Sequence, residues 1–320
     1  MRPGPLVAQA LEIAVALAAA PLFLGWVNQC RAWLANRSAP SILLPYRNIR
    51  KLFHKDAVLA ENASALFRIA PYVVFGTMVV AAGIIPSLAG RLPLVVAADA
   101  IALVGLFATA RVFLSLAAMD VGTAFGTLGA RREMMVGFLA EPALLMVIFV
   151  ASMISATTAL PAISAHLASE HLVIDPSLAF TAIAFTLVLL AENARIPVDN
   201  PATHLELTMI HEAMLLEYSA RHLALMEWAA ALRLFNYACI GFALFVPWGI
   251  AGRDIGPLGL TLAVPFLALK LAAAGGGLAV IETLSAKLRV MRAPEFLATA
   301  FLFAVLGLLV HVLLGGARAT

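Results

Sequence analysis

Long apolar stretches alternate with short polar ones along almost the whole chain. About eight of the apolar stretches are long enough to cross the hydrocarbon core of a bilayer, which is roughly 30 Å thick. Backbone polar groups in lipid must be satisfied within each segment, so the pattern predicts an all-α integral membrane protein. The predicted spans lie near residues 6–29, 69–89, 94–118, 134–160, 178–191, 223–248, 258–281 and 296–315.

The composition agrees with a single polytopic membrane domain over residues 1–320. Hydrophobic residues make up 63% of the chain and the mean hydropathy is +0.98, whereas soluble domains are about 45–50% apolar. The polar segments are too short to form a soluble domain, so we expect the chain to bind no large cofactor alone. The first apolar stretch, with Trp26 and Asn28 near its end, fits an uncleaved span better than a signal peptide.

Basic residues are unevenly distributed between the loops on the two sides of the predicted bundle. Most of the 21 Lys and Arg residues fall in alternate loops, above all in residues 31–68. The positive-inside rule places these loops in the cytoplasm. Both termini are then predicted to lie on the periplasmic side, and the net charge of +3 reflects topology rather than nucleic-acid binding.

Residues 37–55 form a predicted interfacial amphipathic helix after the first span. Ile42, Tyr46, Ile49, Leu52 and Phe53 recur at helical spacing, with basic residues on the other side. Such a helix lies in the headgroup plane or beneath a partner protein. The alternative to a partner is a simple anchor to anionic lipids. With a later basic loop, we expect a docking platform that contains Arg47, Arg50, Lys51, Arg289 and Arg292.

Residues 192–221 form a densely charged segment that is rich in acids, in a chain that is only 12% charged overall. Where a membrane helix meets water, such charge must be solvated, paired or functional. Clustered carboxylates resist simultaneous ionisation, so we expect an acidic relay that exchanges protons near neutral pH. The alternative is a solvated loop. The expected relay residues are Glu192, Asp199, Glu206, Glu212 and Glu217.

The spacing within this segment predicts local structure. A helix should begin after Pro201, and Glu206 and Glu217 would share one face of it if it is continuous, because about three turns separate them. His211 and Glu212 lack the second histidine of the zinc motif H-E-x-x-H, so no metal site is predicted.

Arg195 lies within reach of both Glu192 and Asp199 along the chain. Because a guanidinium can bridge two carboxylates, we expect Arg195 to join them in a structural and electrostatic role. A similar role is expected for Arg132 and Lys270.

Several ionisable residues lie in or beside predicted spans, where a charge near the bilayer centre costs about 2.5–3.5 kcal/mol on insertion scales. They are Glu12, Asp99, Arg111, Glu141, Glu227, Arg233, Lys270, Glu282 and His311. Water or a partner must offset that cost. We expect a hydrated path of acids that extends the relay into the membrane through Glu133, Glu141, Glu227 and Glu282. The alternative is that each acid only pairs with Arg111, Arg132, Arg233 or Lys270.

The order of residues in the charged segment resembles a known family signature. The matching elements are Glu192-x-x-Arg195-x-Pro197-x-Asp199, Glu206-Leu207 and Glu217-Tyr218-Ser219. This pattern is similar to that of the NADH dehydrogenase subunit 1 family of complex I. Within it, residues 194–219 (ARIPVDNPATHLELTMIHEAMLLEYS) resemble the branch of energy-converting nickel–iron hydrogenases, the hydrogenase-4 component C and formate hydrogenlyase subunit 4 type. Residues 40–53, 129–133, 141–142, 223–227 and 287–296 extend the resemblance.

The resemblance implies a non-catalytic membrane junction subunit of an energy-converting (group 4) hydrogenase-like complex in the bacterial cytoplasmic membrane. Such a subunit anchors a soluble electron-transfer arm and couples its redox reaction to proton translocation. The chain itself would bind no cofactor, and iron–sulfur clusters with a nickel–iron centre, or a quinone, would belong to the complex. The implied partners are hydrogenase-like large and small subunits and a ferredoxin-like iron–sulfur subunit on the cytoplasmic face, together with antiporter-like membrane subunits.

Two alternatives stay open. In a complex I NADH:quinone oxidoreductase, the same segment would form part of the quinone chamber, but Val198, Ala202 and His204 depart from the residues usual there. The other alternative is a stand-alone cation–proton transporter. Against it, the two halves of the chain share no charged motif that would indicate an inverted repeat.

Overall fold

The computed structural model describes residues 3–90, 93–94, 99–169, 176–195, 210–250, 257–285 and 292–318. Every regular element in these ranges is a helix, which confirms the predicted all-α fold. Within them, seven helices are long and apolar enough to cross a membrane. They are α1 (Pro3–Leu34), α3 (Ala65–Ile84), α5 (Ala100–Asp120), α6 (Ala124–Ser155), α11 (Ala220–Phe245), α12 (Pro257–Leu284) and α13 (Ala293–Arg318).

The fifth predicted span corresponds to α8 (Pro176–Glu192), which is shorter than the others. Its 17 residues reach about 26 Å at 1.5 Å per residue, just below the usual hydrocarbon thickness. After it, Ala194 adopts a left-handed backbone conformation with a φ of 50°. The helix therefore ends at the start of the charged segment instead of continuing into it.

The fourth span begins earlier than the sequence predicted. Hydropathy places its start near residue 134, whereas α6 runs from Ala124 to Ser155 and includes Arg131, Arg132 and Glu133. The sequence pattern placed this charged run in a loop, whereas the structure makes it part of the helix. Glu133 is 1% exposed, and its carboxylate has an ionic partner on a neighbouring helix, so the charge does not stop the helix.

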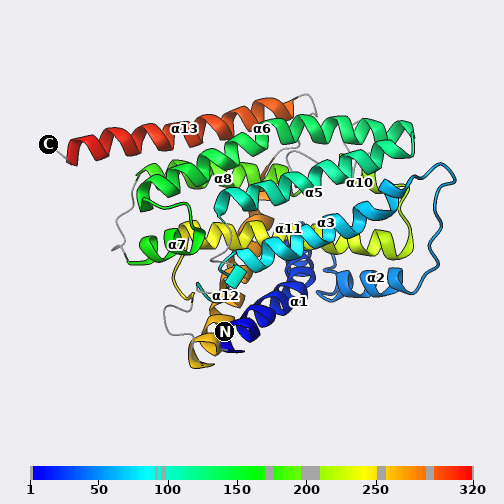
Figure 1. Cartoon of the computed structure of the whole chain (residues 1–320), viewed down its shortest axis with the longest axis horizontal. Helices are drawn as coiled ribbons and strands as arrows, with labels where there is room; N and C mark the ends of the chain where they lie inside the picture. Colours follow the sequence, from blue (N-terminus) through cyan, green and yellow to red (C-terminus); the bar gives the residue numbers. More distant parts are fainter. Residues whose placement is uncertain are drawn as a thin grey trace.

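The long helices form a layered bundle (Figure 1). α13 packs against α8 and α6, α6 packs against α5, and α3 lies between α5 and α11. α1 and α12 pack against each other and run at a steep inclination to the rest of the bundle. Three short helices, α2 (Leu44–Phe53), α7 (Leu160–Ser169) and α10 (His211–Leu215), lie near the ends of the long ones.

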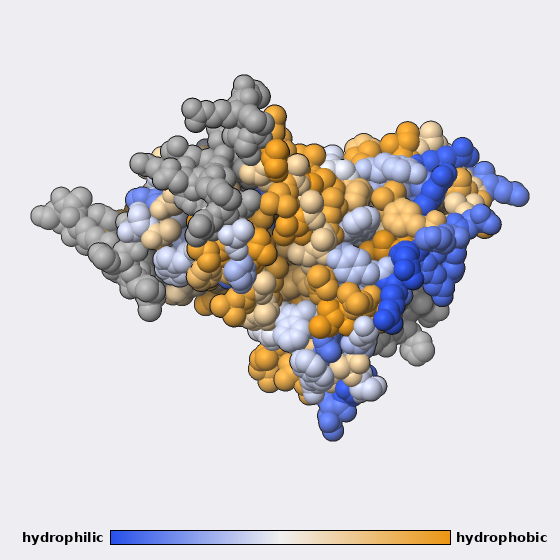
Figure 2. Space-filling view, turned by 90° about the horizontal axis from the view of Figure 1, so that it is seen from below, coloured by the Kyte–Doolittle hydropathy of each residue, from blue (hydrophilic) through white to orange (hydrophobic). Residues whose placement is uncertain are grey.

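Hydrophobic side chains cover the middle of the molecular surface, and hydrophilic ones gather at the end that carries α2 (Figure 2). Large apolar residues such as Phe138, Leu269 and Leu302 are more than half exposed. A soluble protein rarely exposes so much apolar surface in one band, so this band suits contact with lipid or with other membrane subunits.

Candidate functional site

A cluster of charged side chains lies inside the bundle where α10 packs against α6. Its centre is Arg111 of α5, which is 6% exposed. Its guanidinium contacts three carboxylates: Nε lies 3.3 Å from Oε1 of Glu133, Nη1 lies 2.6 Å from Oε1 of Glu141, and Nη2 is paired with Oε1 of Glu192. Thus α5, α6 and α8 each supply a charged group to one site.

The sequence of α6 explains how one arginine reaches two of these acids. Glu133 and Glu141 are separated by about two turns and about 80° around the helix. Gly137 lies midway between them, and a Cβ atom there would come within 2.7 Å of Cδ of Arg111 and collide with its guanidinium. The missing side chain thus creates the space that Arg111 fills.

The charges in the cluster do not balance if every group is ionised. One guanidinium faces three carboxylates, and the side chains of Glu133 and Glu192 are only 2% exposed, whereas that of Glu141 is 35% exposed. Excess negative charge is unfavourable in a low-dielectric interior, which favours binding of a proton somewhere in the set. Tyr237 of α11 interacts electrostatically with both Arg111 and Glu192, so α11 also contributes a side chain to the cluster.

α10 connects the cluster to the charged segment. Nδ1 of His211 lies 3.6 Å from Oε2 of Glu133, the carboxylate whose other oxygen faces Arg111. Burial lowers the pKa of His211 well below its ordinary value, and the positive charges of Arg233 and Arg111 act in the same direction. A neutral imidazole beside a carboxylate can accept or deliver a proton.

A cavity of about 40 Å³ adjoins these groups. Arg111, His211 and Arg233 line its polar side, and Met78, Leu215 and Met226 are among its apolar residues. The space suffices for a few water molecules. Water there would extend the hydrogen-bonding network from the cluster toward Arg233.

A second ion-pair group joins Arg195 to Glu282 rather than to Glu192, while Asp199, the other predicted partner, lies outside the described residues. Nη1 of Arg195 lies 3.3 Å from Oε1 of Glu282, whose Oε2 lies 3.3 Å from Nη1 of Arg31. Glu192 is bound by Arg111 instead, so the predicted Arg195–Glu192 bridge was wrong. The left-handed turn at Ala194 explains this, because it separates the directions of the two side chains. Burial lowers the pKa of Arg195, and Glu282 opposes that effect.

The other described acids of the predicted relay, and Glu227 of the predicted path, are more exposed than Glu192. Glu212 and Glu217 are exposed, and Glu227 is half-buried on α11. Asp199 and Glu206 lie outside the described residues. Glu206 and Glu217 would share one face only on a continuous helix, and α10 stops at Leu215, before Glu217.

The helix stops because tertiary contacts hold the next residues elsewhere. The ring of Tyr218 stacks on Phe67 at 4.0 Å, and its hydroxyl donates to the Phe67 carbonyl. The hydroxyl of Ser219 bonds to the backbone of Val58. These contacts hold Tyr218 and Ser219 in a non-helical conformation directly after Glu217.

The predicted basic residues have different surroundings. Arg47, Arg50 and Lys51 are exposed on α2 and, with His54, surround an open depression of about 370 Å³. Arg292 is exposed at the start of α13, and Arg289 lies outside the described residues. Arg132 is half-buried on α6. Lys270 donates to the Val246 carbonyl at 2.6 Å and pairs with no carboxylate in the described part of the chain.

Sequence reasoning missed the central role of Arg111 and the roles of His211, Tyr237 and Arg31. One signal was available. Arg111 is isolated in an otherwise apolar helix, and α6 carries a glycine midway between two acids. Neither observation specifies which helices meet in space, so only the fold could combine them.

Most of the chain is similar in sequence to known membrane proteins. Residues 7–313 match the NADH dehydrogenase family. Formate hydrogenlyase subunit 4 of Escherichia coli K12 is 31% identical over 296 residues, which cover 92% of this chain and 95% of that protein. Hydrogenase-4 component C of the same organism is 35% identical over 250 residues, 78% of each chain.

A solved structure shares the fold. A chain of the membrane-bound sulfane sulfur reductase, an archaeal respiratory membrane complex, superposes with a TM-score of 0.80 and 18% sequence identity. The match covers 95% of this chain and 98% of that one. This likeness supports the helical architecture of the described residues.

Proposed function

The chain belongs to the NADH dehydrogenase family, and we propose that it is the membrane junction subunit of an energy-converting hydrogenase-like complex. In this role it anchors a soluble electron-transfer arm and couples the redox reaction of that arm to proton translocation. Its relatives are named as subunits of a formate hydrogenlyase and of hydrogenase-4. The resident redox centres, iron–sulfur clusters and a nickel–iron site, would belong to partner subunits.

The observation that carries this proposal is the buried Arg111 with its three carboxylates. One positive charge against three acids makes the proton occupancy of the cluster sensitive to any change of charge nearby. A change in the redox state of an arm docked over α10 alters the local potential. Proton affinity in the cluster then changes with it, which is the physical basis of coupling.

We propose that protons reach the cluster from the end that carries α10. Glu212 and Glu217 are exposed there, and His211 connects the same helix to Glu133. Asp199 and Glu206 are assigned to this entrance from sequence alone. Glu227 remains a proposed later member of the path. Glu282, held between two arginines, fits the alternative role of an ion-pair partner.

A quinone chamber would involve residues 196–209, which lie outside the described ranges, so only the cavity beside Arg111 can be compared with one. Binding pockets for small organic molecules usually have volumes of about 300–1,000 Å³. The cavity beside Arg111 is only about 40 Å³ in the described part of the chain. That space suits water molecules rather than a quinone ring.

We propose α2 as the docking platform for the soluble arm, together with the basic residues before α13. Ile49 is buried on the inner side of α2, while Arg47, Arg50 and Lys51 face outward. A basic surface of this kind suits an acidic partner and steers its association. The antiporter-like subunits would contact the apolar band of the bundle. The platform would face the cytoplasm of a bacterium, and both termini would face the periplasm.

The proposal can be tested in membrane vesicles that contain the whole complex. A low-potential electron donor would drive hydrogen evolution while a pH-sensitive dye reports proton translocation. Glu192→Gln should lower protons moved per electron by about tenfold or more, with the complex still assembled, because glutamine keeps the shape and removes the proton site. Glu61→Gln, an exposed acid away from the cluster, is the matched control. Unchanged coupling in Glu192→Gln would contradict the proposal.

A further inference from the structure

A second buried polar group lies outside the Arg111 cluster, where the N-terminal part of α1 meets the residues that follow α3 (Figure 1). Its centre is Glu12 of α1, which is 0% exposed. Oε1 of Glu12 accepts hydrogen bonds from the backbone N–H of Ser87 at 2.7 Å, the Ser87 hydroxyl at 2.7 Å and the backbone N–H of Leu88 at 3.1 Å. Oε2 is buried without a hydrogen-bond partner among the described residues.

No arginine, lysine or histidine in the described part of the chain lies within ion-pair distance of Glu12. This distinguishes it from Glu133, Glu192 and Glu282, which all have cationic partners. A buried carboxylate without a counter-charge is costly, and uptake of a proton removes that cost. Oε2, the oxygen without a hydrogen-bond partner, is the available place for the proton.

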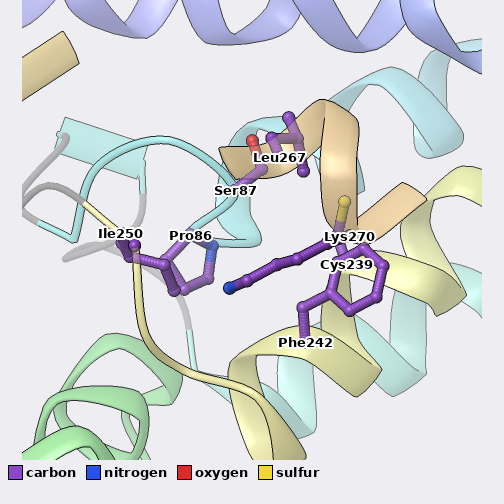
Figure 3. A pocket seen from close by; sticks show the side chains of 8 residues that line it. Pro86, Ser87, Cys239, Phe242, Ile250, Leu267 and Lys270 are labelled. Atoms are coloured by element: carbon purple, nitrogen blue, oxygen red, sulfur yellow. The ribbon is translucent and has the colours of Figure 1, made fainter. Parts of the chain in front are cut away.

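Ser87 connects Glu12 to a small cavity. The residue whose hydroxyl donates to Glu12 is also among those that line a cavity of about 10 Å³, together with Pro86, Cys239, Ile250 and Lys270. The space is about that of one water molecule. Figure 3 shows the Lys270 side chain extending toward Pro86, with Ser87 above both and its hydroxyl drawn beside Leu267.

Lys270 is half-buried and also lacks an ionic partner in the described ranges. Its amine donates to the Val246 carbonyl at 2.6 Å and lies 5.7 Å from the Phe242 ring centre. The groups around it are therefore dipolar and aromatic. The titratable groups that face this cavity are Lys270 of α12 and Cys239 of α11, with Glu12 beyond the Ser87 hydroxyl.

We propose that Glu12, Ser87 and Lys270 form a second proton-transfer site, at the end of the bundle away from α10. The Lys270 ammonium gives a proton to a cavity water, which passes one to the Ser87 oxygen, while the Ser87 hydroxyl proton moves to Glu12. Lys270 becomes neutral and Glu12 becomes the uncharged acid, so atoms and charges balance. The reverse sequence returns the proton to Lys270 and from there to water outside the bundle.

This inference rests on the proposed proton translocation, and it adds a site for proton exchange with the opposite aqueous face. A purely structural role for Glu12, as an acceptor that fixes the turn at Ser87 and Leu88, is the competing explanation. Substitution by glutamine separates the two. The side-chain carbonyl oxygen of the introduced glutamine would still accept the three hydrogen bonds, but it could not carry the proton.

The test compares proton translocation and electron transfer in vesicles that hold the whole complex. Glu12→Gln should lower protons moved per electron by about tenfold, and Ser87→Ala and Lys270→Met should lower it several-fold. Glu295→Gln, an exposed acid on α13, is the control. Unchanged coupling in Glu12→Gln would overturn the inference. If that variant does not assemble, unchanged coupling in Ser87→Ala, which removes only the shared hydroxyl, would overturn it instead.

A second measurement does not depend on turnover. Infrared difference spectra of the complex, recorded across a pH change, should contain the carbonyl stretch of a buried protonated acid, which shifts in heavy water and disappears in Glu12→Gln. A spectrum unchanged by that substitution would also overturn the inference. If Glu192→Gln lowers coupling and Glu12→Gln does not, the proposed site at Glu12 is contradicted but the proposed function is not. If neither variant lowers coupling, the proposed function fails with it.

Discussion

Gly137 of α6 lies directly against the guanidinium of Arg111, in the space between Glu133 and Glu141. The arrangement makes the position of one buried cation depend on the absence of one methyl group. Because interiors are close-packed, that dependence should be measurable.

We expect Gly137→Ala to destabilise the protein by about 1–3 kcal/mol, since the added methyl group displaces Arg111 from its carboxylates. Gly105→Ala is the matched control, because that helical glycine of α5 has nothing within 4 Å of its added Cβ. The control should be neutral or slightly stabilising, by at most about 1 kcal/mol, from helix propensity. Thermal unfolding in detergent measures both. Equal midpoints for the two variants would show that Arg111 can relocate freely.

Acids at the entrance and acids in the cluster should differ in their effects on coupling. Glu133→Gln removes a buried member and should lower protons moved per electron by about tenfold or more. Glu217→Gln removes an exposed group that water can replace, so its effect should stay below about threefold. Proton translocation in vesicles that hold the whole complex compares them. A larger loss in Glu217→Gln than in Glu133→Gln would place the critical step at the surface.

His211 should make the folded state less stable in mild acid. Its pKa is lowered on folding, so the unfolded chain binds a proton that the folded protein excludes at pH values below the ordinary histidine range near 6.5. Stability is then retained above that range and lost as the pH falls, by up to about 1.4 kcal/mol per pH unit for one proton.

His211→Gln should therefore flatten the fall of the unfolding midpoint between about pH 7 and 5. His54→Gln, a change of an exposed histidine on the turn after α2, should leave the slope as it is. Identical slopes for wild type and His211→Gln would mean that the imidazole accepts its proton in the folded state.

The two arginines on Glu282 should contribute unequally. The side chain of Arg195 is 12% exposed, and that of Arg31 is 41% exposed. Removing a buried partner leaves an uncompensated charge and costs about 3–5 kcal/mol, whereas an exposed pair contributes at most about 1 kcal/mol. Arg195→Gln should thus lower the unfolding midpoint far more than Arg31→Gln, and Arg195→Lys should recover only part of the loss. Equal losses would contradict the difference in burial.

Charge reversal on α2 tests the docking platform. Arg47, Arg50 and Lys51 changed together to Glu should release peripheral subunits during purification and leave the membrane bundle folded, because the basic surface becomes acidic. Reversal of Arg37, Lys55 and Arg68, three other exposed basic residues, is the matched control. Retention of the arm after the α2 reversal, with loss of binding to anionic vesicles, would identify α2 as a lipid anchor.

The elements that sequence predicted well are those defined by local periodicity. Hydropathy predicted the spans. The apolar spacing that includes Tyr46, Ile49 and Phe53 predicted an amphipathic helix over residues 37–55, and the structure forms the shorter α2 within that range. Both signals belong to a single helix, so no knowledge of tertiary contacts was needed.

The parts that sequence did not predict depend on contacts between helices. The spacing of Glu133 and Glu141 indicated a shared groove, but their partner Arg111 comes from α5 and could not be deduced from α6. Arg195 was assigned to Glu192 by proximity along the chain, and one left-handed residue, Ala194, turned it toward Glu282. Tertiary contacts of Tyr218 likewise overrode the expected helix.

The two oxygens of Glu133 face different helices, one toward Arg111 of α5 and one toward His211 of α10. A single rigid carboxylate therefore shares its charge between the bundle interior and the helix nearest the charged segment. Linkage then acts in both directions: a partner that displaces α10 changes the proton affinity of the carboxylates around Arg111, and a proton bound by those carboxylates changes the affinity for that partner by the same factor. A partner that drives proton pumping by displacing α10 should therefore bind with an affinity that depends on pH.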